Sequence, residues 1–106
     1  MEKRIIIKEA VFEQLKEEYL YITKNSSLDT AEKFRLEFFE KIESIKPFYN
    51  RFPICKFRKP INKNYRQMIW RDYLIVFKIT KKAIYVLALF HTKKNPKKLN
   101  KSIKEE

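Results

Sequence analysis

The chain has 106 residues, room for one domain, and its 44% hydrophobic content, with 15% aromatic residues, is too high for a disordered segment. Glycine is absent, which excludes glycine-rich phosphate loops. The single cysteine and single histidine exclude a disulfide framework and a multi-Cys or multi-His metal site, so no metal or cofactor is expected.

The N-terminal part of the chain predicts one strand followed by two helices. Residues 4–8 form a short β-branched run typical of a strand. Between residues 9 and 24, apolar residues recur with the period of an amphipathic helix. A second helix is expected to begin at a cap formed by Ser27 or Asp29 and to end at Pro47, which cannot continue the hydrogen-bond ladder. The apolar stripes of the two helices contain Val11, Leu15, Tyr19, Ile22, Ala31, Phe34, Phe38, Ile42 and Ile45.

The C-terminal part predicts a loop and three extended segments. Aromatic residues and prolines mark residues 48–53 as a loop. Enrichment in aromatic and β-branched residues then predicts strands, and the breaks between the last three are short enough for antiparallel hairpins. Residues 55–59 open the first segment, and residues 65–70 are its stronger part, after a polar turn at residues 60–64. The other two segments are residues 73–79 and 84–90.

The predicted order of elements is therefore β-α-α-β-β-β. This order predicts an α+β two-layer domain, in which a helical hairpin packs on one face of a mainly antiparallel sheet and the other face is open. We assign residues 1–96 to this single domain. Residues 97–106 are too polar to pack, and we expect a basic C-terminal tail that is a frayed helix or disordered.

Charge is divided unevenly between the two parts of the chain. Residues 1–43 contain 8 basic and 10 acidic residues, whereas residues 44–104 contain 17 basic residues and one acidic residue, Asp72. Such a basic part attracts nucleic acid, an anionic membrane surface or an acidic protein, or it only keeps the protein in solution. The longest apolar run, residues 83–90, is too short to span a bilayer, and the N-terminus is unlike a signal peptide. A single thiol suits a reducing compartment, so we expect a cytoplasmic protein without a membrane partner.

Arg66 and His91 are the candidate catalytic residues. Arg66 is expected on the same strand face as Met68 and Trp70, and His91 on the face of Leu87 and Leu89. Arginine can stabilise charge on a phosphate, and histidine can carry a proton near neutral pH. Each also has a structural alternative, as an ion-paired strand arginine or a locally bonded surface histidine. The residues expected to contact nucleic acid are Lys56, Arg58, Lys59, Lys93, Lys94 and, by stacking, Tyr73.

The segment YRQMIWRDYLIVFKITKKAIYVLALFHTKKNPKKL, residues 65–99, resembles the C-terminal half of the RelE/ParE superfamily of bacterial toxins. The resemblance lies in an arginine, a tyrosine seven residues later, an aromatic residue four further on, and a hydrophobic strand that ends in histidine and lysines. The segment AEKFRLEFFEKIESIKPF is similar to the second helix of that family, and the likeness extends over residues 1–96.

This resemblance implies the toxin of a type II toxin–antitoxin system, of the kind associated with plasmid stabilisation, and a cognate acidic antitoxin that covers its basic face. RelE-like members cut mRNA on the ribosome without a metal, by attack of the 2′-hydroxyl, which leaves 2′,3′-cyclic phosphate and 5′-hydroxyl ends. In that branch Arg66 stabilises the phosphate and His91 acts as general acid or base. We expect this branch from the positive charge.

Two alternatives remain open at this point. ParE-like members inhibit DNA gyrase without nuclease activity, and a terminal histidine occurs in both branches. Some nuclease members use a glutamate before the arginine as general base, and residues 55–65 contain no acidic residue. The other alternative is a basic nucleic-acid-binding module without enzymatic activity.

Overall fold

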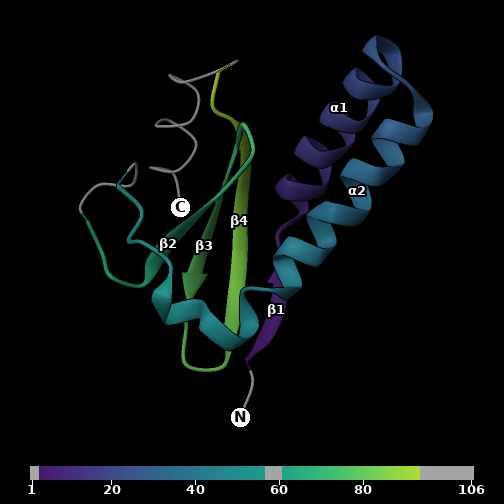
Figure 1. The fold of residues 1–106 in the computed structure, drawn as a ribbon. Helices are drawn as coiled ribbons and strands as arrows, with labels where there is room; N and C mark the ends of the chain where they lie inside the picture. The colour runs from purple at the N-terminus through teal and green to yellow at the C-terminus, as the bar shows by residue number, and fades with distance from the viewer. Residues whose placement is uncertain (1–2, 57–60, 94–106) are drawn as a thin grey trace.

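The computed structural model describes residues 3–56 and 61–93, and these form a helical hairpin beside a four-stranded sheet (Figure 1). The order of elements is the predicted β-α-α-β-β-β, with one short 3₁₀ helix added after the second α-helix. The elements are β1 (Arg4–Ile7), α1 (Glu9–Asn25), α2 (Leu28–Glu43), the 3₁₀ helix η1 (Lys46–Arg51), β2 (Tyr65–Trp70), β3 (Tyr73–Ile79) and β4 (Ala83–His91).

The two α-helices begin and end close to the predicted positions. Ser27 is the cap of α2, because its side-chain oxygen accepts a hydrogen bond from the Thr30 backbone N–H at 3.1 Å. Helix α2 ends at Glu43, before Pro47, which lies in the first turn of η1, where a residue without an N–H is tolerated. No helix among the described residues has the length and apolar character needed to cross a membrane.

The sheet has the order β1-β4-β3-β2. Strand β1 runs parallel to β4, and the other two pairings are antiparallel, so the sheet is mainly antiparallel as predicted. Arg71 and Asp72 connect β2 to β3, and Arg71 has a φ of 55°, which is unusual for a residue with a side chain. The helices and the sheet thus form the two predicted layers.

The main core lies between the helical hairpin and the sheet. Phe38, on α2, is fully buried and packs against Trp70 at a ring-centroid distance of 6.0 Å. Phe34 stacks on Trp70 at 5.1 Å and 18°. The predicted helical stripe therefore faces the sheet. The members of this core are Val11, Leu15, Phe34, Phe38, Ile42, Ile45, Met68, Trp70, Tyr73, Ile75, Phe77, Ile84, Val86 and Leu89.

The opposite sheet face, which we call the far face, is not open as predicted. It carries a second buried cluster, because β3 and β4 are apolar on both sides for most of their length. The members of this cluster are Cys55, Tyr65, Leu74, Val76, Leu87, Ala88 and Phe90. The accessible parts of the far face include Ile69 on β2, which is 71% exposed, and the end near Lys78 and Tyr85, which are partly exposed.

Three further expectations are corrected. Residues 48–51 belong to η1 rather than to a loop. Ile54 makes a single bridge to Arg66, and residues 55 and 56 form no strand. The Cys55 N–H donates to the Tyr65 carbonyl, whereas the Lys56 N–H donates to the Gln67 side chain. Strand β4 has a bulge at Leu87, because Val76 pairs with Ala88 while Phe77 pairs with Val86. The bulge turns Leu87 to the far face, so His91 shares a face with Leu89 but not with Leu87.

Candidate functional site

Arg66 lies at the start of β2, on the face of Met68 and Trp70, as predicted. Its guanidinium binds three backbone carbonyls. The Nε atom donates to the Lys63 carbonyl at 2.6 Å, and Nη1 donates to the carbonyls of Asn50 at 2.8 Å and Phe52 at 2.9 Å. These bonds use three of the five donors of the side chain and hold the end of η1 against β2.

His91 ends β4 and lies beside Tyr73, at the other end of β3. The two rings meet edge to face at a centroid distance of 5.1 Å. The Tyr73 hydroxyl donates to Glu18 Oε1 at 2.8 Å, and burial together with this carboxylate raises the pKa of Tyr73. His91 Nδ1 accepts a hydrogen bond from the backbone N–H of Lys93 at 3.3 Å.

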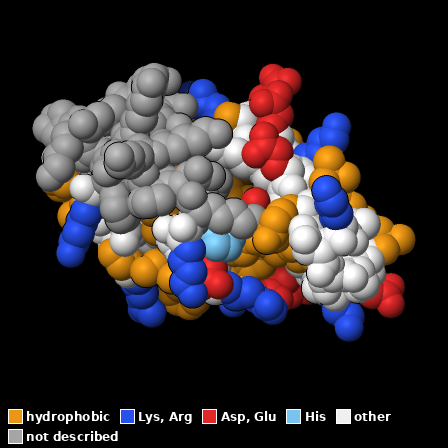
Figure 2. Space-filling view, turned by 90° about the horizontal axis from the view of Figure 1, so that it is seen from above, with side chains coloured by type: hydrophobic (Ala, Val, Ile, Leu, Met, Phe, Trp, Pro, Cys, Tyr) orange, Lys and Arg blue, Asp and Glu red, His pale blue; other side chains and the backbone are white. Residues whose placement is uncertain are grey.

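A cleft of about 410 Å³ separates this end of the sheet from the tip of the helical hairpin. Figure 2 looks down on this region and shows the one histidine at the surface, with acidic, basic and hydrophobic side chains nearby. Glu37 lies in the cleft wall and accepts hydrogen bonds from Trp70 Nε1 and from Arg71, whose Nη2 is 2.7 Å from Oε2. These donors, Arg71 above all, lower the pKa of the Glu37 carboxyl. The cleft wall is therefore held by its own ion pair and hydrogen bonds.

Arg66 and His91 are not brought together by this fold. Arg66 on β2 pairs with Phe77 of β3, whereas His91 on β4 pairs with Tyr73 of β3. Phe77 and Tyr73 are four residues apart along β3, and β2 and β4 flank β3 on opposite sides. Four residues of a strand span about 13 Å. The backbones of the two residues are thus well separated, and the Arg66 guanidinium is bound at its own end of the sheet.

The predicted nucleic-acid contacts are dispersed in the same way. Lys56 is exposed beside the start of β2, near Arg66. Lys93 is exposed beyond the end of β4, where its Nζ lies 3.4 Å from Asp72 Oδ1. Tyr73 is buried in the main core, so its ring faces packed side chains. Arg58, Lys59, Lys94 and the tail at residues 97–106 lie outside the described residues.

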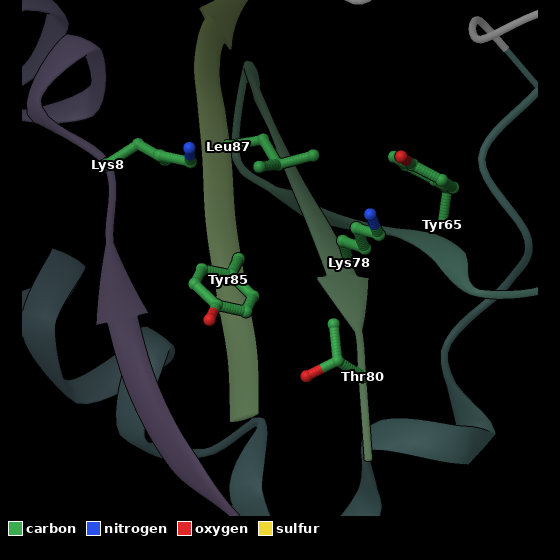
Figure 3. A pocket seen from close by; sticks show the side chains of 6 residues that line it. All are labelled: Lys8, Tyr65, Lys78, Thr80, Tyr85 and Leu87. Carbon is green, nitrogen blue, oxygen red and sulfur yellow. The ribbon is translucent and has the colours of Figure 1, made fainter. Parts of the chain in front are cut away.

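A basic hollow on the far face escaped the sequence analysis (Figure 3). Its volume is about 460 Å³, and its lining residues are Lys8, Tyr65, Lys78, Thr80, Tyr85 and Leu87. The sequence contains a signal for this hollow. Lys8 and Lys78 each come directly after an apolar run in a strand, and the alternation of side chains along a strand turns both away from the helices. Within the described part of the chain, no group of three His, Cys, Asp or Glu side chains could hold a metal ion.

Comparison with known proteins decides the family. The family model described as the ParE toxin of the type II toxin–antitoxin system, parDE, matches residues 5–96. The chain belongs to the ParE toxin family. A solved structure described as the chromosomal ParDE TA system from P. aeruginosa shares the fold, with a TM-score of 0.70 and 13% sequence identity over 84% of this chain and 95% of the other. No curated protein sequence matches the chain.

Membership of the ParE family confirms the predicted RelE/ParE superfamily resemblance and the toxin–antitoxin context. This context supports an antitoxin as the partner of the chain. The α+β fold of this chain is also the one predicted from its sequence.

Proposed function

We propose that this ParE-family chain inhibits DNA gyrase without cutting mRNA, and that a cognate acidic antitoxin neutralises it. The observation that carries the proposal is the separation of Arg66 from His91. Cleavage of RNA by its own 2′-hydroxyl needs a charge-stabilising group and a proton carrier within hydrogen-bond reach of one phosphate. A ParE-type toxin that acts by binding needs no such pair.

The bonding of Arg66 supports the same reading. A catalytic arginine presents its donors to the substrate, whereas three donors of Arg66 are bound to backbone carbonyls of the protein itself. The match of residues 5–96 to the ParE model adds to this support.

The second candidate is a RelE-like, ribosome-dependent endoribonuclease. The basic character of residues 44–104, with exposed Lys56 and Lys93, favours this candidate, because a ribosome and its mRNA are polyanions. In this case Lys56, Arg58, Lys59, Lys93 and Lys94 hold the RNA. The burial of Tyr73 and the separation of Arg66 from His91 count against the roles predicted for those three residues.

Two assays with the same preparation of the full chain separate these candidates. One measures supercoiling of relaxed plasmid by purified gyrase, and the other maps new 5′ ends of a defined mRNA in a purified translation system. We expect loss of supercoiling, intact mRNA, and unchanged inhibition by the His91→Gln variant. New 5′ ends that require ribosomes and diminish with His91→Gln would overturn the proposal in favour of the nuclease, and normal supercoiling would also overturn it.

A further inference from the structure

The accessible end of the far face carries positive charge without acidic neighbours on the sheet. The four strands contain no Asp or Glu, whereas nine acidic residues lie on α1 and α2 in the other layer. Arg4 and Lys8 alternate with the core-facing Ile5 and Ile7, and Lys78 is on the same side of the sheet from β3. The far face is thus a local source of positive potential.

Lys8 and Lys78 approach the hollow from opposite sides of β4. Lys8 follows β1, which pairs with β4 on one edge, and Lys78 pairs with Tyr85 from β3 on the other. Two strand spacings, about 10 Å, lie between the strands of these lysines, and Lys8 is also level with Leu87, two residues along β4 from Tyr85. Figure 3 shows Lys8 pointing toward β4, with Leu87 on the other side of the strand, and Lys78 between Leu87 and Tyr65. Flexible lysine stems allow both ammonium groups to reach one anion above β4.

The lysines are available for such an anion. The ion pairs of the described residues involve other basic side chains, Arg35, Lys46, Arg71 and Lys93. Lys78 Nζ lies over the Tyr65 ring at 5.4 Å from its centroid, and this cation–π contact orients the ammonium group without neutralising it. Two like charges that share one hollow are favoured when an anion lies between them.

The aromatic part of the hollow indicates what else the ligand contains. Tyr85 is partly exposed at the centre of the hollow, on β4, and Leu87 beside it is buried and apolar. A tyrosine ring next to lysines accepts a base by stacking while the lysines bind its phosphate. A carboxylate side chain would use the lysines but not the ring.

We propose that this hollow binds a nucleotide, with its phosphate between Lys8 and Lys78 and its base on Tyr85. The nucleotide is either free or one unit of a single strand, since both sources present the same phosphate and base. This site shares no residue with the Arg66 and His91 regions, and it does not depend on whether gyrase or mRNA is the target of the toxin.

The test uses the purified full chain with a fluorescein-labelled DNA strand of about eight nucleotides, a length typical of one single-strand binding site. DNA is chosen because it lacks the 2′-hydroxyl, so RNA-type cleavage cannot consume the probe. Binding is followed by fluorescence anisotropy between about 50 and 200 mM salt. Adenosine monophosphate and a short oligoglutamate are the two competitors, and neither gyrase nor ribosomes are present, so the result is independent of the proposed function.

The double variant Lys8→Gln/Lys78→Gln should weaken binding and reduce the slope of log K against log salt by about 0.7, as for the loss of one neutralised phosphate on a single strand. The matched control, Lys16→Gln/Lys24→Gln on α1, removes the same charge from the helical layer and should keep the slope. Tyr85→Leu should weaken binding about fivefold or more, whereas Tyr85→Phe retains the ring face and the affinity. Circular dichroism checks that each variant is folded.

If adenosine monophosphate displaces the strand, the free nucleotide is a sufficient ligand. If the strand binds but adenosine monophosphate does not displace it, the ligand is a nucleotide within a strand. Both results support the site. An equal loss in the two double-lysine variants would show general charge attraction and overturn the proposal. Displacement by oligoglutamate but not by adenosine monophosphate, or no binding of the strand, would overturn it as well.

Discussion

Replacement of Arg66 by alanine distinguishes a scaffold role of this residue from a catalytic one. The change removes three hydrogen bonds from a charged donor. The carbonyls of Lys63 and Asn50 accept their hydrogen bonds in exposed positions and can bind water in the variant, whereas the Phe52 bond is partly buried. A hydrogen bond to a charged group contributes about 1.5–3 kcal/mol when its partner cannot be rehydrated. We therefore expect the free energy of unfolding to fall by about 2 kcal/mol, because only one of the three carbonyls loses its partner in this way.

Urea unfolding followed by circular dichroism measures this loss. With an m-value of about 1–2 kcal/mol/M for a small domain, the midpoint should fall by about 1–2 M. Lys56→Ala, at an exposed neighbouring position, is the control and should change the midpoint little. If Arg66→Ala has the stability of the unmodified chain but loses toxicity, the scaffold interpretation is refuted, and Arg66 acts on a ligand instead.

Two further predictions concern the contact between α2 and the sheet. Phe38→Ala should lower the free energy of unfolding by about 3–5 kcal/mol, because Phe38 is fully buried, and should lower the melting temperature by about 12 °C or more. Phe12→Ala, at an α1 side chain that is 46% exposed, should cost about 1 kcal/mol or less, and equal effects of the two would contradict the burial of Phe38 between α2 and the sheet. Glu37→Gln should lower stability by about 1 kcal/mol at neutral pH. Because Arg71 and Trp70 lower the pKa of Glu37 in the folded chain, its contribution is present above the usual carboxyl pKa of 4.5 and is lost as the pH falls below it. The free energy of unfolding should therefore fall less with decreasing pH in this variant than in the unmodified chain. An unchanged pH profile would contradict the role of Glu37.

Local patterns in the sequence determine the elements of this protein. The helical stripe with Phe34 and Phe38 has a period that only a helix can turn toward one neighbour, and both residues are buried against the sheet. The strands at residues 65–70 and 73–79 are evident from aromatic and β-branched residues, with a connection too short for anything but a hairpin. Composition does not determine the structure of the residues between Pro47 and Pro53, because a 3₁₀ turn and a loop share the same residue types.

The roles of individual side chains depended on contacts between distant parts of the chain. Arg66 is a residue type suited to catalysis, but the carbonyls that bind it come from η1, from Phe52 just after η1 and from Lys63 just before β2. The alternation of β4 predicted His91 on the face of Leu87, and one bulge moved Leu87 to the other side.

The α+β class, the order of the elements and the uneven charge therefore follow from periodicity and composition along the chain. The tertiary structure alone decided that Arg66 and His91 stand at opposite ends of β3 and that Lys8 and Lys78 share a hollow. Strand order and register set these distances. They are chosen by the packing of the whole sheet against the helices, which no local pattern encodes.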